Sequence, residues 1–339
     1  MGGVKVTSAE VAARAGVSQS AVSRVFTPGA SASRKTIEKV RRAAEELGYR
    51  PNVLARAMVS GRSRIIGLVV AYLENQFYPV ALERLSLALQ DRGYRILIFT
   101  TPNSTDGVDA VMEDLMDYQV DGIVAASVSL GSDLAARAQA AGVPVVLFNR
   151  GQDLPSCSAV TSANRAGGRK VAEFLIAGGH RRIAHIAGWQ GSSTGQDRQA
   201  GFLDAMDAAG LAPLAVMDGM YSREAAMGCA RELLDANVCP DAIFVGNDHM
   251  AFAVIDALRA AGLVPGRDIS VVGYDDVPLA AWGAYDLTTL RQPLNRMIAA
   301  TVDTLLDQID DPDRAPQRIE IDGPLILRGS ARVPEGWTS

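Results

Sequence analysis

The stretch TSAEVAARAGVSQSAVSRVF, from Thr7 to Phe26, decides how the N-terminal part of this chain folds. Thr7 is followed three residues later by Glu10, which is the pattern of a capping box and predicts a helix that begins after Thr7. Gly16 allows a tight turn, and Ser18 can cap a second helix that runs to about Phe26. Two short helices joined by such a turn are typical of a helix-turn-helix.

A third helix completes this N-terminal domain. Ser33 can cap it and Gly48 can end it, while Ile37, Val40 and Ala44 recur at helical spacing on one face. We therefore predict a three-helix domain of the kind that places its second helix in the major groove of DNA.

The second helix carries the side chains that we expect to read DNA. Its exposed face would present Gln19, Ser20 and Arg24, and Gln and Arg can form paired hydrogen bonds with adenine and guanine edges. We expect phosphate contacts from four further residues, namely Ser18, Ser23, Ser33 and Arg34. The alternative is a small helical protein-interaction domain, whose helices would carry similar caps.

The distribution of charge favours DNA over that alternative. Residues 1–62 contain eleven Lys and Arg against four Asp and Glu, a charge of +7, whereas the remainder contains 22 basic and 34 acidic residues, a charge of −12. A basic domain joined to an acidic body indicates a local surface for a polyanion. The acidic body would repel DNA and confine contact to the N-terminal domain.

From residue 65 onward, apolar β-like runs alternate with amphipathic helices, which predicts parallel sheets in an α/β body. The expected strands are 65–71, 94–100, 122–126, 143–148, 183–187, 242–245 and 269–273. The expected helices are 79–92, 130–141, 164–177, 198–209, 224–236 and 250–261. This body is too long for one such sheet, so we expect two α/β subdomains.

Several segments, in order along nearly the whole chain, resemble the LacI/GalR family of repressors. They are VSQSAVSRVF (17–26), SASRKTIEKVRRAAEELGYRPNVLARAMVSGRSRIIGLVV (31–70), GHRRIAHIAG (179–188), DRQAGF (197–202), GNDHMAFAVIDAL (246–258), DISVVGYDD (268–276) and LTTLRQP (287–293). The resemblance implies a periplasmic-binding-protein-like body of two Rossmann-type subdomains, between which the chain crosses three times. It also puts Gln19, Ser20 and Arg24 at the family's base-reading positions.

This resemblance and the pattern of elements predict four parts in the chain. They are a helix-turn-helix domain at 1–50, a hinge helix and linker at 51–63, an N-terminal effector-binding subdomain at 64–163 with 291–325, and a C-terminal one at 164–290 with 326–339.

The hinge would begin at Pro51, which suits the first position of a helix, but it is too short to be stable alone. It can therefore fold when it docks on DNA. The resemblance implies that paired hinge helices enter the minor groove, where Met58 holds the position of an apolar wedge. Small Ala55 would permit close approach, and we count Asn52 with them as a DNA contact. A plain interdomain linker is the alternative.

Polar residues just after predicted strands are the candidates for effector binding, because α/β folds bind ligands at strand carboxyl ends. The full set is Asn75, Phe77, Asn149, Arg198, Tyr221, Asn247 and Asp275. Their carboxylate, amide and guanidinium groups suit a sugar or a similar polar ligand, on which Phe77 and Tyr221 could stack. A structural ion pair is the alternative for Arg198, expected to begin a helix, and Asp275, and we interpret Asp248 as a helix N-cap.

Two departures from the family's pattern leave the identity of the effector open. Gln76 stands where many relatives have proline, and Asn149 stands where aspartate is frequent.

Catalytic patterns are weak in this chain. Residues 191–195 read GSSTG, which matches the G-x-S-x-G nucleophile elbow, but small polar residues before a helix are also ordinary loop composition. There is no Walker loop, no HExxH and no G-x-G-x-x-G after the first strand. Three scattered histidines and three widely spaced cysteines fit neither a metal site nor a disulfide framework. We therefore expect no enzyme activity, cofactor or metal.

The expected function is a transcriptional regulator, most simply a repressor. A homodimer would bind a pseudo-palindromic double-stranded operator, under the control of a small sugar-like effector. The N-terminus has no hydrophobic signal core and no apolar run is long enough to span a bilayer, so we expect a cytoplasmic protein without a membrane partner. The alternatives are a solute-binding protein and an enzyme with no transcriptional role.

Overall fold

The computed structural model describes residues 6–26, 31–50, 62–71, 73–101, 105–128, 130–236 and 238–337. The hinge calls on Asn52, Ala55 and Met58 fall at 51–61, outside the described residues. By its internal contacts the chain divides into two compact units, one formed by 1–65 with 119–121 and the other by 66–118 with 122–339.

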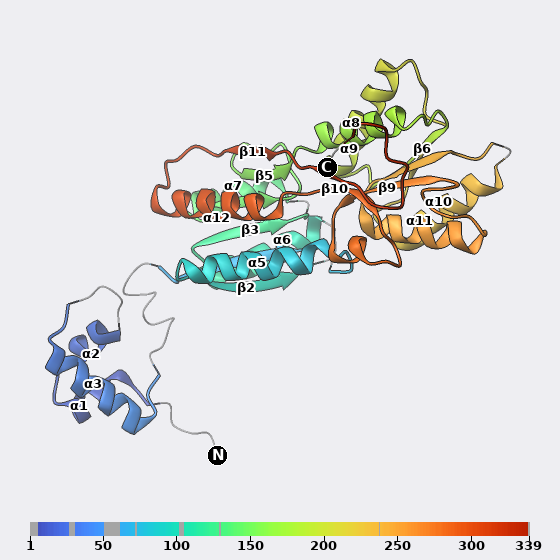
Figure 1. Ribbon diagram of the computed structural model, residues 1–339. Coiled ribbons are helices and arrows are strands. Elements are labelled where there is room, and N and C mark those ends of the chain that lie inside the picture. Colours follow the sequence, from blue (N-terminus) through green and yellow to red (C-terminus); the bar gives the residue numbers. More distant parts are fainter. Residues whose placement is uncertain are drawn as a thin grey trace. The chain divides into compact units, whose positions relative to one another are not determined.

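The N-terminal unit contains the three predicted helices, α1 (Ser8–Ala15), α2 (Gln19–Phe26) and α3 (Arg34–Leu47) (Figure 1). The capping box is present, because the Glu10 amide donates to Thr7 Oγ1 at 3.3 Å and the Thr7 amide donates to Glu10 Oε2 at 2.7 Å. Ser18 Oγ accepts from the Ala21 amide at 3.3 Å, and Ser33 Oγ accepts from the Thr36 amide at 3.2 Å. The three caps predicted from the sequence are therefore confirmed.

One side chain from each helix fixes the packing of this unit. Val11, Val22 and Val40 are fully buried, and small Ala12 lets α1 and α2 approach closely. At the edge of this core the Phe26 and Tyr49 rings lie 5.9 Å apart. This core packs against one face of α2 and leaves the opposite face exposed to solvent.

The body contains two six-stranded sheets. The first has the order β11-β5-β4-β3-β1-β2, with parallel pairing at β11-β5, β5-β4, β4-β3 and β3-β1. Its strands are β1 (Ile65–Val70), β2 (Arg95–Thr100), β3 (Gly122–Ala126), β4 (Val145–Phe148), β5 (Ser158–Ser162) and β11 (Arg318–Ile321). Its helices are α5 (Phe77–Asp91), which packs beside α12 (Leu294–Asp310), and α6 (Thr105–Asp117), which packs beside α7 (Ser132–Ala140).

The second sheet has the order β12-β10-β9-β8-β6-β7, and only its β10-β12 pair is antiparallel. Its strands are β6 (Ile183–Ala187), β7 (Ala215–Asp218), β8 (Ala242–Val245), β9 (Ser270–Asp275), β10 (Thr288–Arg291) and β12 (Leu325–Ile326). Its helices are α8 (Asn164–Ala177), α9 (Ser193–Ala208), α10 (Arg223–Asp235), α11 (Asp248–Ala260) and the 3-10 turn η1 (Pro278–Ala281) (Figure 1).

The chain passes between the two sheets three times, from β5 to α8, from β10 to α12 and from β11 to β12. This is the pair of Rossmann-type subdomains, joined by three crossings, that the resemblance implies. Arg291 and Leu325 pair within the second sheet, so the strands divide the chain a few residues away from the bounds expected at 291 and 325.

All seven predicted strands are present, each within two residues of its expected ends. The remaining strands were not predicted from the sequence because they are short. In addition, β7, β11 and β12 lie at sheet edges, where the pattern of apolar residues is weak. The expectation that Arg198 begins a helix is wrong. Ser192 Oγ accepts from the Gly195 amide and caps α9, so Arg198 lies in its second turn.

Two glycines allow α8 and α9 to pack with their backbones almost in contact. A Cβ atom at Gly168 would lie 2.0 Å from the Arg198 carbonyl oxygen, and one at Gly201 would lie 1.8 Å from the Arg165 carbonyl oxygen. Backbone atoms cannot give way as a flexible side chain can. This close approach determines where α9 carries Arg198.

None of the helices in the described ranges is long and apolar enough to cross a membrane.

Substituting alanine at Gly201 tests the close approach. We expect Gly201→Ala to lower the free energy of unfolding by about 1–3 kcal/mol, because the added methyl group forces α8 and α9 apart. Gly228→Ala in α10 is the matched control, since nothing lies within 4 Å of its new Cβ, and it should raise stability by up to about 1 kcal/mol. Urea denaturation measures the free energy of unfolding of both variants. Equal changes in the two variants would contradict the close packing of α8 on α9.

Candidate functional site

The outer face of α2 carries the predicted base-reading residues. Ser18, Gln19, Ser20 and Arg24 are exposed, and Ser23 is half-buried. Gln19 Nε2 donates to Ser8 Oγ on α1 at 2.8 Å, and Arg24 Nε donates to the Ser20 carbonyl oxygen at 3.4 Å. These weak surface contacts can exchange for base or phosphate atoms at little cost.

The two predicted phosphate contacts on α3 differ in availability. The side chain of Arg34 is 95% exposed and lies 3.5 Å from Glu38, an arrangement that contributes little and can be displaced. The Ser33 hydroxyl caps α3, so its oxygen is already used as an acceptor.

In the body, polar side chains gather where strands of the first sheet end. Asn149 follows β4 and Ser127 follows β3, and because these strands are parallel neighbours their carboxyl ends meet. Asn149 Nδ2 donates to Ser127 Oγ at 3.1 Å and to the Tyr78 hydroxyl at 3.0 Å, and Tyr78 donates to Ser127. Asn149 Oδ1 is buried and has no hydrogen-bond partner among the described residues.

Arg198 is the buried cation of the second subdomain, with 2% of its surface exposed. Its Nε donates to Asn164 Oδ1 at 2.9 Å, its Nη1 donates to the Gly246 carbonyl oxygen at 2.6 Å, and its guanidinium carbon lies 3.6 Å from the centre of the Tyr274 ring. A charge of this kind persists inside a protein only when such contacts replace water.

Asp275 supplies the opposing charge and connects the two subdomains. Its Oδ1 lies 3.6 Å from Arg198 Nη1 and accepts from Gln292 Nε2 at 2.7 Å, while its Oδ2 accepts from Nδ2 of Asn75, a residue that follows β1 of the first sheet. Burial raises the pKa of Asp275, and the Arg198 charge and the Gln292 and Asn75 hydrogen bonds oppose that rise. The structural ion pair weighed from the sequence is thus present.

The backbone at this point is strained. Asp275 has a φ of 121° and Asp276 has a φ of 57°, two consecutive non-glycine residues with positive φ. Each such residue costs on the order of 1–3 kcal/mol. The buried hydrogen bonds to the Asp275 carboxylate hold it in this conformation.

The other predicted effector residues differ from one another in their contacts. The Tyr221 hydroxyl bonds to Thr194 Oγ1 at 2.9 Å. Phe77 is buried and stacks on Phe148 with ring centres 6.3 Å apart, so it packs in the core of the first subdomain. The Asn247 oxygen accepts from the Met250 amide, so this residue caps α11.

The interpretation of Asp248 as the N-cap is therefore wrong. Asp248 is fully buried one position further on, where Oδ1 accepts from the Thr289 hydroxyl at 2.6 Å and Oδ2 accepts from the Val277 amide at 2.9 Å. Burial raises its pKa well above the usual range. It fixes the turn that follows Asp275.

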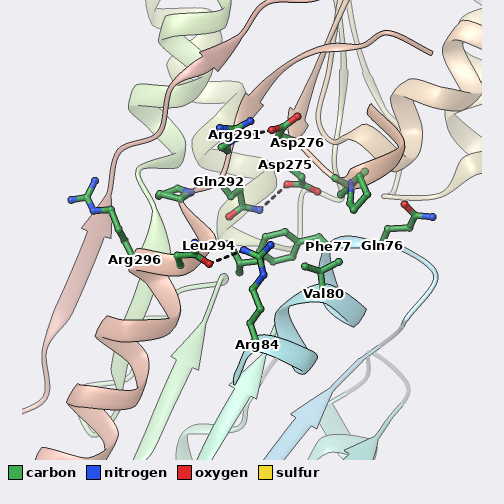
Figure 2. Close-up of a pocket in the computed structure, with 14 residues that line it drawn as sticks. Gln76, Phe77, Val80, Arg84, Asp275, Asp276, Arg291, Gln292, Leu294 and Arg296 are labelled. Carbon is green, nitrogen blue, oxygen red and sulfur yellow. Dashed lines mark hydrogen bonds and ion pairs between the residues drawn. The ribbon is translucent and has the colours of Figure 1, made fainter. Parts of the chain in front are cut away.

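A cavity of about 490 Å³ lies between the start of α5, the turn after β9 and the start of α12. Figure 2 shows Gln292 bonded to Asp275 on one side of this cavity, with Phe77, Val80 and Arg84 of α5 on the other. Gln292, Ser127 and Tyr78 are site residues that sequence reasoning missed. Gln292 follows β10 in the segment LTTLRQP, and a polar residue after that strand was the available signal.

The nucleophile position of the G-x-S-x-G pattern is Ser193, the first residue of α9, and the residue before it has a structural role. Ser192 caps α9 and donates to the Trp189 carbonyl oxygen at 2.7 Å. His185 is fully buried, and burial lowers its pKa to about 4, while its Nδ1 bonds to the Phe244 carbonyl oxygen. Among the described residues there is no cluster of three His, Cys, Asp or Glu that could hold a metal ion.

Comparison with known proteins agrees with both units. The sequence profile described as "Bacterial regulatory proteins, lacI family" matches residues 7–52, and that of the "Periplasmic binding protein-like domain" matches residues 172–331. The chain is 34% identical to the HTH-type transcriptional regulator CelR of Thermobifida fusca over 94% of this chain and 96% of that protein.

This chain belongs to the LacI family. It is therefore a transcriptional regulator rather than an enzyme. The resemblance found in the sequence and the predicted fold are confirmed.

Two solved structures of LacI-family members match the whole chain. The lac repressor dimer bound to operator and the anti-inducer ONPF has a TM-score of 0.87 at 28% identity, with 96% of this chain and 99% of that chain covered. The complex of CelR with cellobiose has a TM-score of 0.73 at 33% identity, with 96% and 100% covered.

Two aspartates of this LacI-family chain test how much the buried ion pair contributes. We expect Asp275→Asn to lower the free energy of unfolding by about 3 kcal/mol, because it leaves the Arg198 charge buried without a carboxylate. Asp303→Asn breaks a half-exposed pair with Arg92 and should cost less than about 1 kcal/mol. Chemical denaturation compares them, and similar small losses would show that the Arg198–Asp275 pair is dispensable for stability.

Proposed function

We propose that this chain is a repressor that binds a pseudo-palindromic operator as a homodimer and that a sugar-like effector in the body controls its affinity for DNA. The observation that carries the DNA half is the exposed face of α2, where Gln19, Ser20 and Arg24 stand on a rigid, basic three-helix unit. Helix-turn-helix proteins read the major groove with such a face.

The part of this proposal that concerns the effector rests on polar side chains that are buried between the two sheets. Asn149 Oδ1 and Gln292 Oε1 are buried without partners among the described residues. Gln292 donates to Asp275, which lies 3.6 Å from Arg198. A ligand rich in hydroxyl groups would satisfy such acceptors and also donate to or accept from the charged pair. That the related CelR has been solved with cellobiose supports a sugar as the effector class.

The dimer and the hinge complete the proposal. A two-fold axis in the protein would match a pseudo-palindrome in the DNA, and the related lac repressor has been solved as an operator-bound dimer. Asn52, Ala55 and Met58 remain predicted minor-groove contacts. Because bacterial operators are cytoplasmic, the proposal puts the protein in that compartment.

Effector binding would act by shifting a population. A ligand that binds one arrangement of the two subdomains more tightly than another favours that arrangement. The Asn75–Asp275 hydrogen bond joins residues of the two subdomains, so a ligand that engages Asp275 competes with or reinforces this contact. The change in subdomain arrangement would then reach the hinge and the DNA-binding helices.

Substitution of Arg24 tests the DNA-reading face. The substrates are duplexes that the wild-type protein selects from a random pool. We expect Arg24→Ala to weaken binding by about tenfold or more and to relax preference at one base position, because a paired contact to a base is worth about 1–3 kcal/mol.

Arg24→Lys is the matched control. It keeps the charge but not the two-pronged geometry, so it should retain the salt dependence of wild type while losing the base preference. Fluorescence anisotropy over a salt series measures both quantities. If Arg24→Ala binds DNA with the affinity and the base preference of wild type, then Arg24 does not read a base.

A further inference from the structure

A second contact between the two subdomains lies beside the residues that we propose for the effector. Arg150 follows β4 of the first sheet, and Trp189 follows β6 of the second. The guanidinium carbon of Arg150 lies over the Trp189 ring, 5.4 Å from its centre, which is within the range of cation–π attraction. This contact therefore joins the two subdomains, as the Asn75–Asp275 hydrogen bond also does.

The strand orders place these two contacts on different sides of the effector residues. In the first sheet, β3 lies between β1, which precedes Asn75, and β4, which precedes Arg150. In the second sheet, β8 lies between β9, which ends at Asp275, and β6, which precedes Trp189. Neighbouring strands are about 4.8 Å apart, so the two contacts are separated by about 10 Å.

Polar groups of the proposed effector site occupy the space between the two contacts. Ser127 follows β3, and its Oγ accepts from Asn149 Nδ2 at 3.1 Å. Gly246 follows β8, and its carbonyl oxygen accepts from Arg198 Nη1 at 2.6 Å. A ligand that reaches Asn149 and Arg198 would therefore have one contact between the subdomains on either side of it.

The loop after β6 fixes the orientation of the Trp189 ring. The Trp189 carbonyl oxygen accepts from the Ser192 amide at 3.1 Å and from Ser192 Oγ at 2.7 Å. A Cβ atom at Gly191 would lie 2.2 Å from the Trp189 ring, so the ring packs directly on the glycine backbone. The orientation of Trp189 is thus determined within the second subdomain.

Arg150 is the buried member of the contact, with 3% of its surface exposed. A buried guanidinium charge needs protein groups that replace its water, and the Trp189 ring from the other subdomain is one of them. Cation–π attraction is stronger for a desolvated cation than for an exposed one. Separation of the subdomains would remove this partner, so the contact favours the closed arrangement.

We propose that the Trp189–Arg150 contact holds the two subdomains closed over the effector site and opens when the effector enters or leaves. Trp189 is a positioning residue in this account, because it acts through Arg150 and the subdomain arrangement. The inference rests on the proposed function for the identity of the site, and it adds a residue that regulates access to that site.

The test measures amide hydrogen exchange in the full-length protein, without effector or DNA. The reporters lie at the other contact: the Phe77 amide donates to Asn75 Oδ1 at 3.0 Å, and the Val277 amide donates to Asp248 Oδ2 at 2.9 Å. We expect Trp189→Leu to raise the exchange rates of both amides about fivefold or more, because the subdomains separate more often.

Two further variants separate loss of the contact from a general loss of stability. Trp189→Phe keeps an aromatic ring and should exchange more slowly than Trp189→Leu at both reporters. Trp337→Leu is the matched control, because Trp337 is also a half-buried tryptophan of the second subdomain but packs on Phe174 of α8. It should leave both reporter amides at the wild-type rate.

Arg150→Met removes the cation from the other side of the contact. It should raise the two exchange rates as Trp189→Leu does, and the double variant should exchange no faster than either single variant, because the contact is already lost.

Three results would overturn the closing contact. They are wild-type exchange of Phe77 and Val277 in Trp189→Leu, an equal increase in Trp337→Leu, and additive increases in the double variant. None of them would contradict the proposed function, since neither DNA nor effector takes part in the measurement. The Arg24 variants test operator binding separately.

Discussion

The buried ion pair between Arg198 and Asp275 constrains most of the body. Two charges with almost no exposed surface need partners that replace water, and here these partners come from distant parts of the chain: Asn164 and Gly246 for the arginine, Asn75 and Gln292 for the aspartate. The close packing of α8 on α9 brings Arg198 to this point. The strained backbone at the end of β9 turns Asp275 toward it.

In the proposed function, this constraint is the means by which a binding site in the body would control the DNA-binding unit. Asp275 belongs to the second sheet and Asn75 follows β1 of the first, so their hydrogen bond spans the two subdomains. A ligand that contacts Asp275 or Gln292 changes the energy of that arrangement.

Much of this could be predicted from the sequence because the signals are local. The caps at Thr7, Ser18 and Ser33 and the buried strands each depend on neighbouring residues, and they fold as expected. The roles of Asn247 and Asp248 could not be assigned in the same way, because both are polar residues after a strand and only the distant Thr289 and Val277 decide which one caps α11. Phe77 both lines the cavity beside Asp275 and packs on Phe148, and this second contact depends on the long-range order of β1 and β4.

In the proposed function, the Asn75–Asp275 contact across the two subdomains sets the affinity for operator DNA. Asn75→Ala tests it most directly, because it removes the bond to Asp275 without leaving a charge unpaired. The measurement is the operator dissociation constant of the full-length variant, with circular dichroism to confirm the fold. We expect a change of about tenfold, typical of coupling between sites, although the substitution is far along the chain from α2. An operator affinity equal to that of wild type in a correctly folded variant would contradict it.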